Sequence, residues 1–140
     1  MITLKKARSI IKAALAKGEE LGLQPLSVAV LDAGGHLIAF ERSDGASVGR
    51  FEIARGKAYG CLMLGMGGKA LLGRSQTTPG FTNALSGVYD GKFVPVPGGV
   101  LVRDKKGTIL GAVGVTGDTS DNDAVAAVAG IEATGLTAEP

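Results

Sequence analysis

Side chains that can bind an anion gather in three separate parts of this sequence. Arg42 and Asp44 form the first group. Arg55 and Lys57 form the second, in a stretch with helical character. Thr116, Asp118 and Thr119 form the third. Guanidinium and ammonium groups bind carboxylates through charge-assisted hydrogen bonds. If the fold brings the three parts together, the set predicts a pocket for a small anionic ligand. The alternative is a structural salt bridge in which Arg42 or Lys57 pairs with Asp44.

The sequence lacks the common patterns of hydrolases, dinucleotide-binding enzymes and zinc proteins. No Gly-x-Ser-x-Gly motif is present, and the glycines of residues 65–68 do not follow a predicted strand. One His and one Cys cannot complete a zinc site, which needs three or four ligands. The aspartates of residues 118–123 lack the central glycine and the distal glutamate of a calcium loop, so we interpret them as helix caps. No metal site is predicted.

Length and composition indicate one globular domain over residues 1–140. Of these residues 45% are apolar and only 4% aromatic, so the core must consist mainly of small aliphatic side chains. The net charge is +2, and the 15 basic and 13 acidic residues are interleaved, which argues against nucleic acid as a partner. No run reaches the roughly 18 to 20 apolar residues of a membrane span, and no secretory signal opens the chain. We therefore expect a cytoplasmic protein that binds neither nucleic acid nor membrane.

Residues 98–133 form the unit around which we expect the chain to be organised. Residues 98–103 and 108–115 predict a β-hairpin, from which a polar loop leads into a helix. Gly111 and Gly114 leave the backbone of the second strand uncovered, so a ligand, a helix or another subunit can approach it closely.

A second unit with the same layout lies earlier in the chain. Residues 27–32 and 36–42 predict two strands joined by a glycine turn, and a polar loop at 43–47 leads into a helix over 48–64. If both hairpins share one antiparallel sheet with their outgoing ends together, the three groups of polar side chains converge on one pocket. An amphipathic helix beginning near residue 4 precedes this unit.

Further patterns predict packing and helix ends. Gly56 and Gly60 each cost a helix about 1 kcal/mol relative to Ala, so we expect them to pack closely against the sheet or a second subunit. Residues 120–123 fit a capping pattern in which a hydroxyl precedes a carboxylate by three residues. Residues 74–80 predict a loop, and residues 137–140 are expected to fray.

Five segments of the chain, taken in order, carry a family resemblance. They are residues 32–37, 42–46, 51–57, 97–100 and 111–117, the last followed by Asp121. Through them the chain resembles the GlcG/HbpS-like family, which is described as haem-binding or haem-degrading and shares the domain at the C-terminus of PduO-type proteins. Any one segment is a weak signal, but five in register are fairly specific.

The resemblance implies an α+β domain, with an antiparallel sheet of about five strands built from two β-hairpins and with helices packed on it. It implies assembly into homodimers up to homo-octamers and haem as the ligand, whose propionates suit the cations named above. His36 is a secondary candidate as the iron ligand, because a residue beside a turn usually hydrogen-bonds locally. Other side chains that can touch haem iron are Cys61, Met63, Met66, Tyr59 and Tyr89.

Two other functions remain open at this point. One is an enzyme that acts on a small carboxylate or carbonyl compound, with Arg42 or Lys57 holding the anion and Asp44 or Asp118 acting as the base. The other is an assembly module without chemistry of its own.

Overall fold

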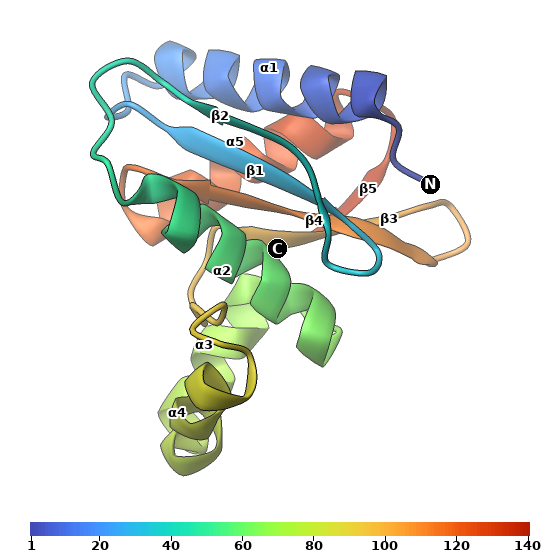
Figure 1. Cartoon of the computed structure of the whole chain (residues 1–140). Helices are drawn as coiled ribbons and strands as arrows, with labels where there is room; N and C mark the ends of the chain where they lie inside the picture. Colours follow the sequence, from blue (N-terminus) through green and yellow to red (C-terminus); the bar gives the residue numbers. More distant parts are fainter.

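A five-stranded antiparallel sheet separates two helical layers in the computed structural model, which describes residues 1–140 (Figure 1). The strands follow the spatial order β2-β1-β4-β3-β5 and are β1 (Ser27–Asp32), β2 (Leu37–Arg42), β3 (Gly99–Arg103), β4 (Ile109–Thr116) and β5 (Thr137–Glu139). The helices are α1 (Leu4–Glu20), α2 (Arg50–Leu64), α3 (Gly68–Thr77), α4 (Pro79–Val88) and α5 (Ser120–Glu132). This arrangement confirms the predicted α+β fold with two β-hairpins.

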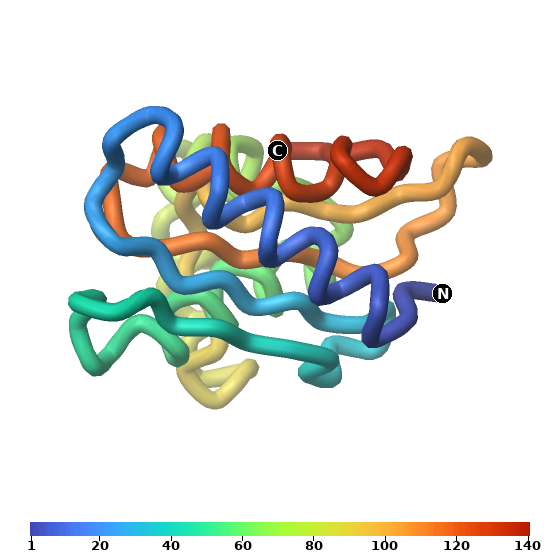
Figure 2. The backbone as a smooth tube through the Cα atoms, turned by 90° about the horizontal axis from the view of Figure 1, so that it is seen from above, coloured from blue at the N-terminus to red at the C-terminus, as the bar shows by residue number.

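Helices α1 and α5 cover one face of the sheet, and α2 covers the other (Figures 1 and 2). Because side chains alternate along a strand, each strand contributes to both layers. Val28 and Val30 of β1 are fully buried in the larger apolar cluster beneath α1 and α5. Leu31 is buried in a second cluster that contains Ala58 and Cys61 of α2. The two sides of the sheet therefore have separate cores.

Helices α3 and α4 form a hairpin that extends from α2 away from the sheet (Figure 1). The buried anchors of this hairpin are Leu71 and Leu85, which join Phe93 in the apolar cluster on the α2 side. Residues 74–80, predicted as a loop, are instead the end of α3 and the start of α4, separated by Thr78. Pro79 at the first position of α4 allows the second helix to begin there.

Helix α2 lies directly on the backbone of the sheet. Gly99 and Gly114 pair with each other across β3 and β4. A methyl group on Gly114 would collide with the backbone of Ala54, and one on Gly99 with the backbone of Lys57. The sequence predicted that a ligand, a helix or another subunit approaches the glycines of β4. At Gly114 the structure places a helix of the same chain, α2.

The other two glycines of interest face an extended segment of the same chain. A Cβ atom on Gly56 would lie 2.8 Å from Val94 Cγ2, and one on Gly60 would lie 2.9 Å from Phe93 Cδ1. The expectation that these glycines pack against the sheet or a second subunit is wrong, because the segment that precedes β3 occupies this side of α2.

The outgoing ends of both hairpins lie at the same end of the sheet. Ser27 of β1 pairs with Arg42 of β2 on one side and with Thr116 of β4 on the other. Since neighbouring strands are about 4.8 Å apart, the Arg42 and Thr116 backbones are separated by roughly 10 Å. The predicted meeting of the two exits is confirmed by this register.

Two predictions about chain ends are wrong in detail. Residues 137–140 do not fray as a unit, because Thr137–Glu139 pair with β3 as the edge strand β5. The hydroxyl that caps α5 is that of Thr119, which accepts a hydrogen bond from Asn122 N at 3.3 Å, and the Asp123 carboxylate of the predicted pattern is paired with Lys57 instead.

Candidate functional site

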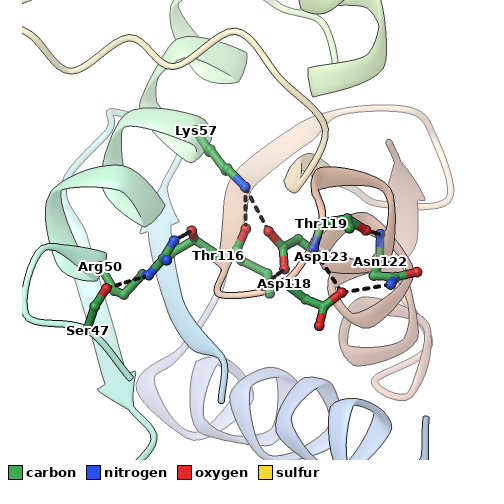
Figure 3. Close-up of polar contacts among 9 residues, drawn as sticks. Ser47, Arg50, Lys57, Thr116, Asp118, Thr119, Asn122 and Asp123 are labelled. Carbon is green, nitrogen blue, oxygen red and sulfur yellow. Dashed lines mark hydrogen bonds and ion pairs between the residues drawn. The ribbon is translucent and has the colours of Figure 1, made fainter. Parts of the chain in front are cut away.

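A buried ion pair joins α2 to α5 behind the outgoing end of β4 (Figure 3). Lys57 Nζ donates to Asp123 Oδ2 and to the carbonyl oxygen of Val115, both at 3.0 Å. The two charged side chains are 4% and 1% exposed. Burial lowers the pKa of Lys57, while the Asp123 carboxylate acts in the opposite direction. The Lys57 ammonium thus has two acceptors inside the protein and is shielded from solvent, so this lysine links α2 to β4 and α5.

The loop after β4 is organised by a second carboxylate, Asp118. Its oxygens accept hydrogen bonds from Asn122 Nδ2 at 2.8 Å, from Gln24 N at 2.9 Å and from Thr119 N at 2.8 Å. These bonds lower the pKa of Asp118, and the bond from Asn122 contributes most to the lowering. A carboxylate that is hydrogen-bonded in its ionised form is a weak proton acceptor at neutral pH.

Arg50 completes this end of the sheet and was missed by the sequence analysis. It is the first residue of α2, and its Nε and Nη1 donate to Ser47 Oγ and Thr116 Oγ1, both at 2.8 Å (Figure 3). Beside Thr116, the Ser27 hydroxyl is buried with no hydrogen-bond partner in the chain. The start of α2 has no side-chain cap, because the capping position is Gly49, and the Ser47 hydroxyl accepts from Arg50 instead.

The predicted site residues therefore separate into three environments. Lys57 and Thr116 are buried and already paired, and Asp118 and Thr119 fix the loop before α5. Asp44 is exposed and lines a shallow cavity of about 260 Å³ against the end of α1. Arg42, at the end of β2, and Arg55, in α2, make no hydrogen bond or ion pair through their side chains.

These two arginines share a surface between the outer side of α2 and the edge strand β2. We call it the α2–β2 face, and it consists of Leu37, Phe40, Arg42, Phe51, Arg55 and Tyr59. Phe40 and Arg42 pair with Ala29 and Ser27 of β1, which places both on the α2 side of the sheet. None of the chain's ion pairs includes either arginine of this face.

Aromatic contacts hold the middle of the α2–β2 face. The rings of Phe40 and Phe51 meet edge to face with centroids 5.0 Å apart. The Arg55 guanidinium lies 5.0 Å from the Phe51 centroid, and its Nε is buried without a hydrogen-bond partner. Leu37, at the far end of β2, is 48% exposed. The face thus combines exposed apolar surface with cations that no carboxylate neutralises.

Tyr59 lies one helical turn beyond Arg55 on the same side of α2. Its ring packs against Gly35 in the β1–β2 turn, where a Cβ atom would lie only 2.8 Å from Tyr59 Cε2. Tyr89 approaches the ring edge at a centroid distance of 5.9 Å, and Lys92 Nζ lies 5.0 Å from the Tyr59 centroid. The Tyr59 hydroxyl makes no hydrogen bond in the chain and is not among the buried unpartnered atoms, so it reaches the surface.

His36 and Cys61 lie in different surroundings. The His36 side chain is 82% exposed, and its Nδ1 is 3.2 Å from Asp32 Oδ1. Asp32 pairs across the sheet with Gly111, which faces Ile2 in the α1 layer, so His36 is on the opposite side of the sheet from Tyr59. Cys61 is buried, and burial raises the pKa of its thiol to about 12.

The spacing of four residues among Phe51, Arg55 and Tyr59 is the sequence signal that would have identified the α2–β2 face. Residues four apart share one side of a helix. Assigning that side to solvent also required knowing that β2 is an edge strand, which is a property of the sheet order. Arg50 carries no comparable signal, because its partner Thr116 is 66 residues away.

A family model described as "Haem degrading protein HbpS-like" matches residues 2–132. Among curated proteins, an uncharacterised 15.0 kDa protein from the dhaT-dhaS intergenic region of Citrobacter freundii is 31% identical over 122 residues, which cover 87% of this chain and 84% of that protein. None of the helices meets the length and hydropathy that crossing a bilayer requires.

Three solved structures, among others, have the same fold as this chain. A PduOC–haem complex superposes with a TM-score of 0.85 at 23% identity, covering 97% of this chain and 96% of that chain. The Klebsiella pneumoniae protein ORFY gives a TM-score of 0.84 at 25% identity, with 96% and 90% covered. A double mutant of Streptomyces reticuli HbpS gives 0.80 at 28% identity, with 93% and 84% covered.

Proposed function

This chain belongs to the HbpS-like family of haem degrading proteins, and on that premise we propose that it binds haem on the α2–β2 face. One observation carries the proposal: Arg55 lies over the half-buried ring of Phe51, Arg42 follows Phe40 on the same side of β2, and neither arginine forms an ion pair. Haem presents two propionates on one edge of a flat apolar ring, and this face offers cations next to flat apolar groups. Guanidinium groups suit carboxylates because they can donate two parallel hydrogen bonds.

The side chains of the face fit the parts of haem. Arg42 and Arg55 would bind the propionates, and the buried, unpartnered Nε of Arg55 is a donor that lacks an acceptor in the chain alone. Phe40 and Phe51 would contact the macrocycle, with Leu37 extending the apolar surface. Iron in the bound haem would supply the oxidative chemistry, while the chain holds and orients the macrocycle.

The cavities elsewhere offer a poorer fit. The largest, of about 500 Å³, lies between α1 and β2 and is lined by Arg8, Lys12, Leu15, Ala16, Glu19 and Glu41. It contains two carboxylates, which would oppose propionates, and no side chain that commonly ligates haem iron. We therefore favour the α2–β2 face, although none of the five cavities is lined by its residues.

The openness of the α2–β2 face leads us to include self-association in the proposal. A haem on an open surface keeps one of its faces in water, which forgoes the burial of apolar area that drives tight binding. A second copy of the chain covering the face would remove that exposure. We propose a homo-oligomer, from dimer to octamer, and expect haem to increase the mass measured by light scattering at a fixed protein concentration.

Titration with ferric haem, followed at the Soret band, tests the proposal. Arg55→Gln and Arg42→Gln should each weaken binding about 10-fold, since each removes a charge-assisted bond to a propionate. Arg74→Gln is the matched control, because Arg74 also lies over an aromatic ring, Phe81, at 5.2 Å but on the α3–α4 hairpin. Equal affinities in all three variants, or no saturable binding by the wild type, would refute haem binding at this face.

The same wild-type complex tests haem degradation. Loss of the Soret band on addition of peroxide, or of a reductant in air, is the expected result if the family description extends to this chain. A Soret band that stays constant would limit the function to binding. Binding of acetate at millimolar concentration without any haem binding would instead favour a protein that acts on a small carboxylate.

A further inference from the structure

We propose that Tyr59 supplies the protein ligand to haem iron, with Lys92 as the positive charge beside it. This inference rests on the proposed function, because it assigns the iron-binding end of the same α2–β2 face. Tyr59 projects from α2 on the side that carries Phe51 and Arg55, as the spacing of four residues requires. The α2–β2 face therefore offers the cations of Arg42 and Arg55 to the propionates at one end and the Tyr59 phenol to the iron at the other end.

The surroundings of Tyr59 hold its ring in place and leave its oxygen free. Gly35 packs against the Cδ2–Cε2 edge of the ring, at a site where any larger residue would displace it. Tyr89 meets the ring at an interplanar angle of 70°. The hydroxyl has no acceptor or donor in the chain and reaches the surface. A fixed ring with an unpaired oxygen is the arrangement that a metal ligand needs.

Lys92 provides the charge that an iron-bound phenolate needs. On binding ferric iron the Tyr59 Oη gives up its proton to solvent and forms one bond to the metal as an anion. Lys92 Nζ lies 5.0 Å from the centroid of this ring. No carboxylate pairs with Lys92, so its charge is available to the phenolate.

The other candidate ligands are less suited to this face. Cys61 is fully buried, and the raised pKa of its thiol opposes formation of the thiolate that binds iron. His36 lies on the α1 side of the sheet with its imidazole against Asp32. The Met63 methyl group lies 3.6 Å from the Cβ position of Gly35, so its thioether packs under the turn.

The test compares ferric haem with iron-free protoporphyrin IX in the intact protein. Tyr59→Phe removes only the oxygen, so we expect it to abolish the ferric–tyrosinate bands in resonance Raman spectra and to weaken haem binding about 10-fold or more. Its affinity for protoporphyrin IX should change less than about twofold, because propionate and ring contacts remain. Tyr89→Phe and His36→Ala are the controls and should keep the tyrosinate bands. Lys92→Gln should keep the tyrosinate bands and should lower the affinity for ferric haem but not the affinity for protoporphyrin IX.

Each outcome decides between the two proposals. Wild-type spectra without tyrosinate bands, or bands that persist in Tyr59→Phe, would overturn the assignment of Tyr59 while protoporphyrin binding still supports the α2–β2 face. Failure of the wild type to bind both haem and protoporphyrin IX would refute the proposed function and this inference with it. Circular dichroism of Tyr59→Phe identifies any loss of folding, and its protoporphyrin affinity serves as the second readout.

Discussion

Lys57 and Arg55 illustrate how two cations two residues apart acquire different roles. On a helix such residues point to nearly opposite sides. Lys57 points toward α5 and ends in a buried ion pair with Asp123, whereas Arg55 points outward and lies over Phe51. A buried pair is costly to break, because removing one partner leaves the other charge without compensation.

Asp123→Ala should therefore lower the free energy of unfolding by about 3 to 5 kcal/mol, since it strands the Lys57 ammonium inside the protein. The matched control is Asp121→Ala, an exposed residue in the first turn of the same helix, with an expected loss of about 0.5 kcal/mol. Urea denaturation followed by circular dichroism measures both. Replacing both partners, as Lys57→Met with Asp123→Leu, should recover only part of the loss, because Asp118 N also donates to Asp123 Oδ1, at 2.9 Å, and stays without that acceptor. Similar values for the two single variants would contradict this account.

Which cations are free and which are paired could not be predicted from the sequence at this scale. Residue types predicted Arg42, Arg55 and Lys57 as one set, because each carries a cation that can bind an anion. The partner of Lys57 lies 66 residues further along the chain, so no local pattern identifies it. The assignment of the free arginines to a ligand stays a prediction, which the haem titration tests.

At the scale of elements, α2 lies so close to the sheet that only glycine fits in the strands beneath it. Gly99 and Gly114 sit side by side beneath α2, and the helix backbone occupies the space of their missing side chains. The depth at which α2 lies fixes the height of Phe51, Arg55 and Tyr59 above β2. The geometry of the α2–β2 face is therefore set by glycines that do not belong to it.

Gly114→Ala should lower the free energy of unfolding by about 3 kcal/mol, because its methyl group would push α2 off the sheet. Gly73→Ala provides a control of opposite sign. Nothing lies within 4 Å of a Cβ at Gly73, which is inside α3, so the change should raise the stability by about 1 kcal/mol through helix propensity. Thermal unfolding of both variants is the measurement. A neutral Gly114→Ala would show that α2 can move outward without loss.

The sequence predicted the hairpins and main helices well because their signals are local. Alternating apolar residues, glycine turns and caps occur within a few positions of one another. The occupant of the space beside Gly114 and the edge strand β5 depend instead on distant pairings. Residues 137–139 have little strand character alone and become a strand because β3 offers an open edge.

At the scale of the whole molecule, the sheet has two edge strands, β5 beside β3 and β2 beside β1. Strand β5 has three residues, and Glu139 Oε1 accepts from Arg103 Nε at 2.8 Å. An uncovered strand edge exposes unpaired backbone groups that recruit other chains. The short strand therefore protects β3 from intermolecular pairing.

Removal of residues 137–140 should lower the free energy of unfolding by about 1 to 2 kcal/mol and cause concentration-dependent aggregation, because the β3 edge becomes free. Glu139→Gln keeps the strand and removes only a partly exposed ion pair, so it should cost less than about 1 kcal/mol and leave the protein unaggregated. Light scattering over a concentration series, together with urea denaturation, separates the two effects. Aggregation of both variants alike would attribute protection to the charge and not to the strand.

The α3–α4 hairpin contributes Leu71 and Leu85 to the apolar cluster on the α2 side of the sheet. Strand pairing, the glycine contact under α2 and the Lys57 ion pair all lie outside it. Insertions or deletions between Thr77 and Pro79 would consequently lengthen or shorten a projecting arm and leave the sheet undisturbed. Diversification among chains of this architecture can thus accumulate in the arm while the α2–β2 face keeps its shape.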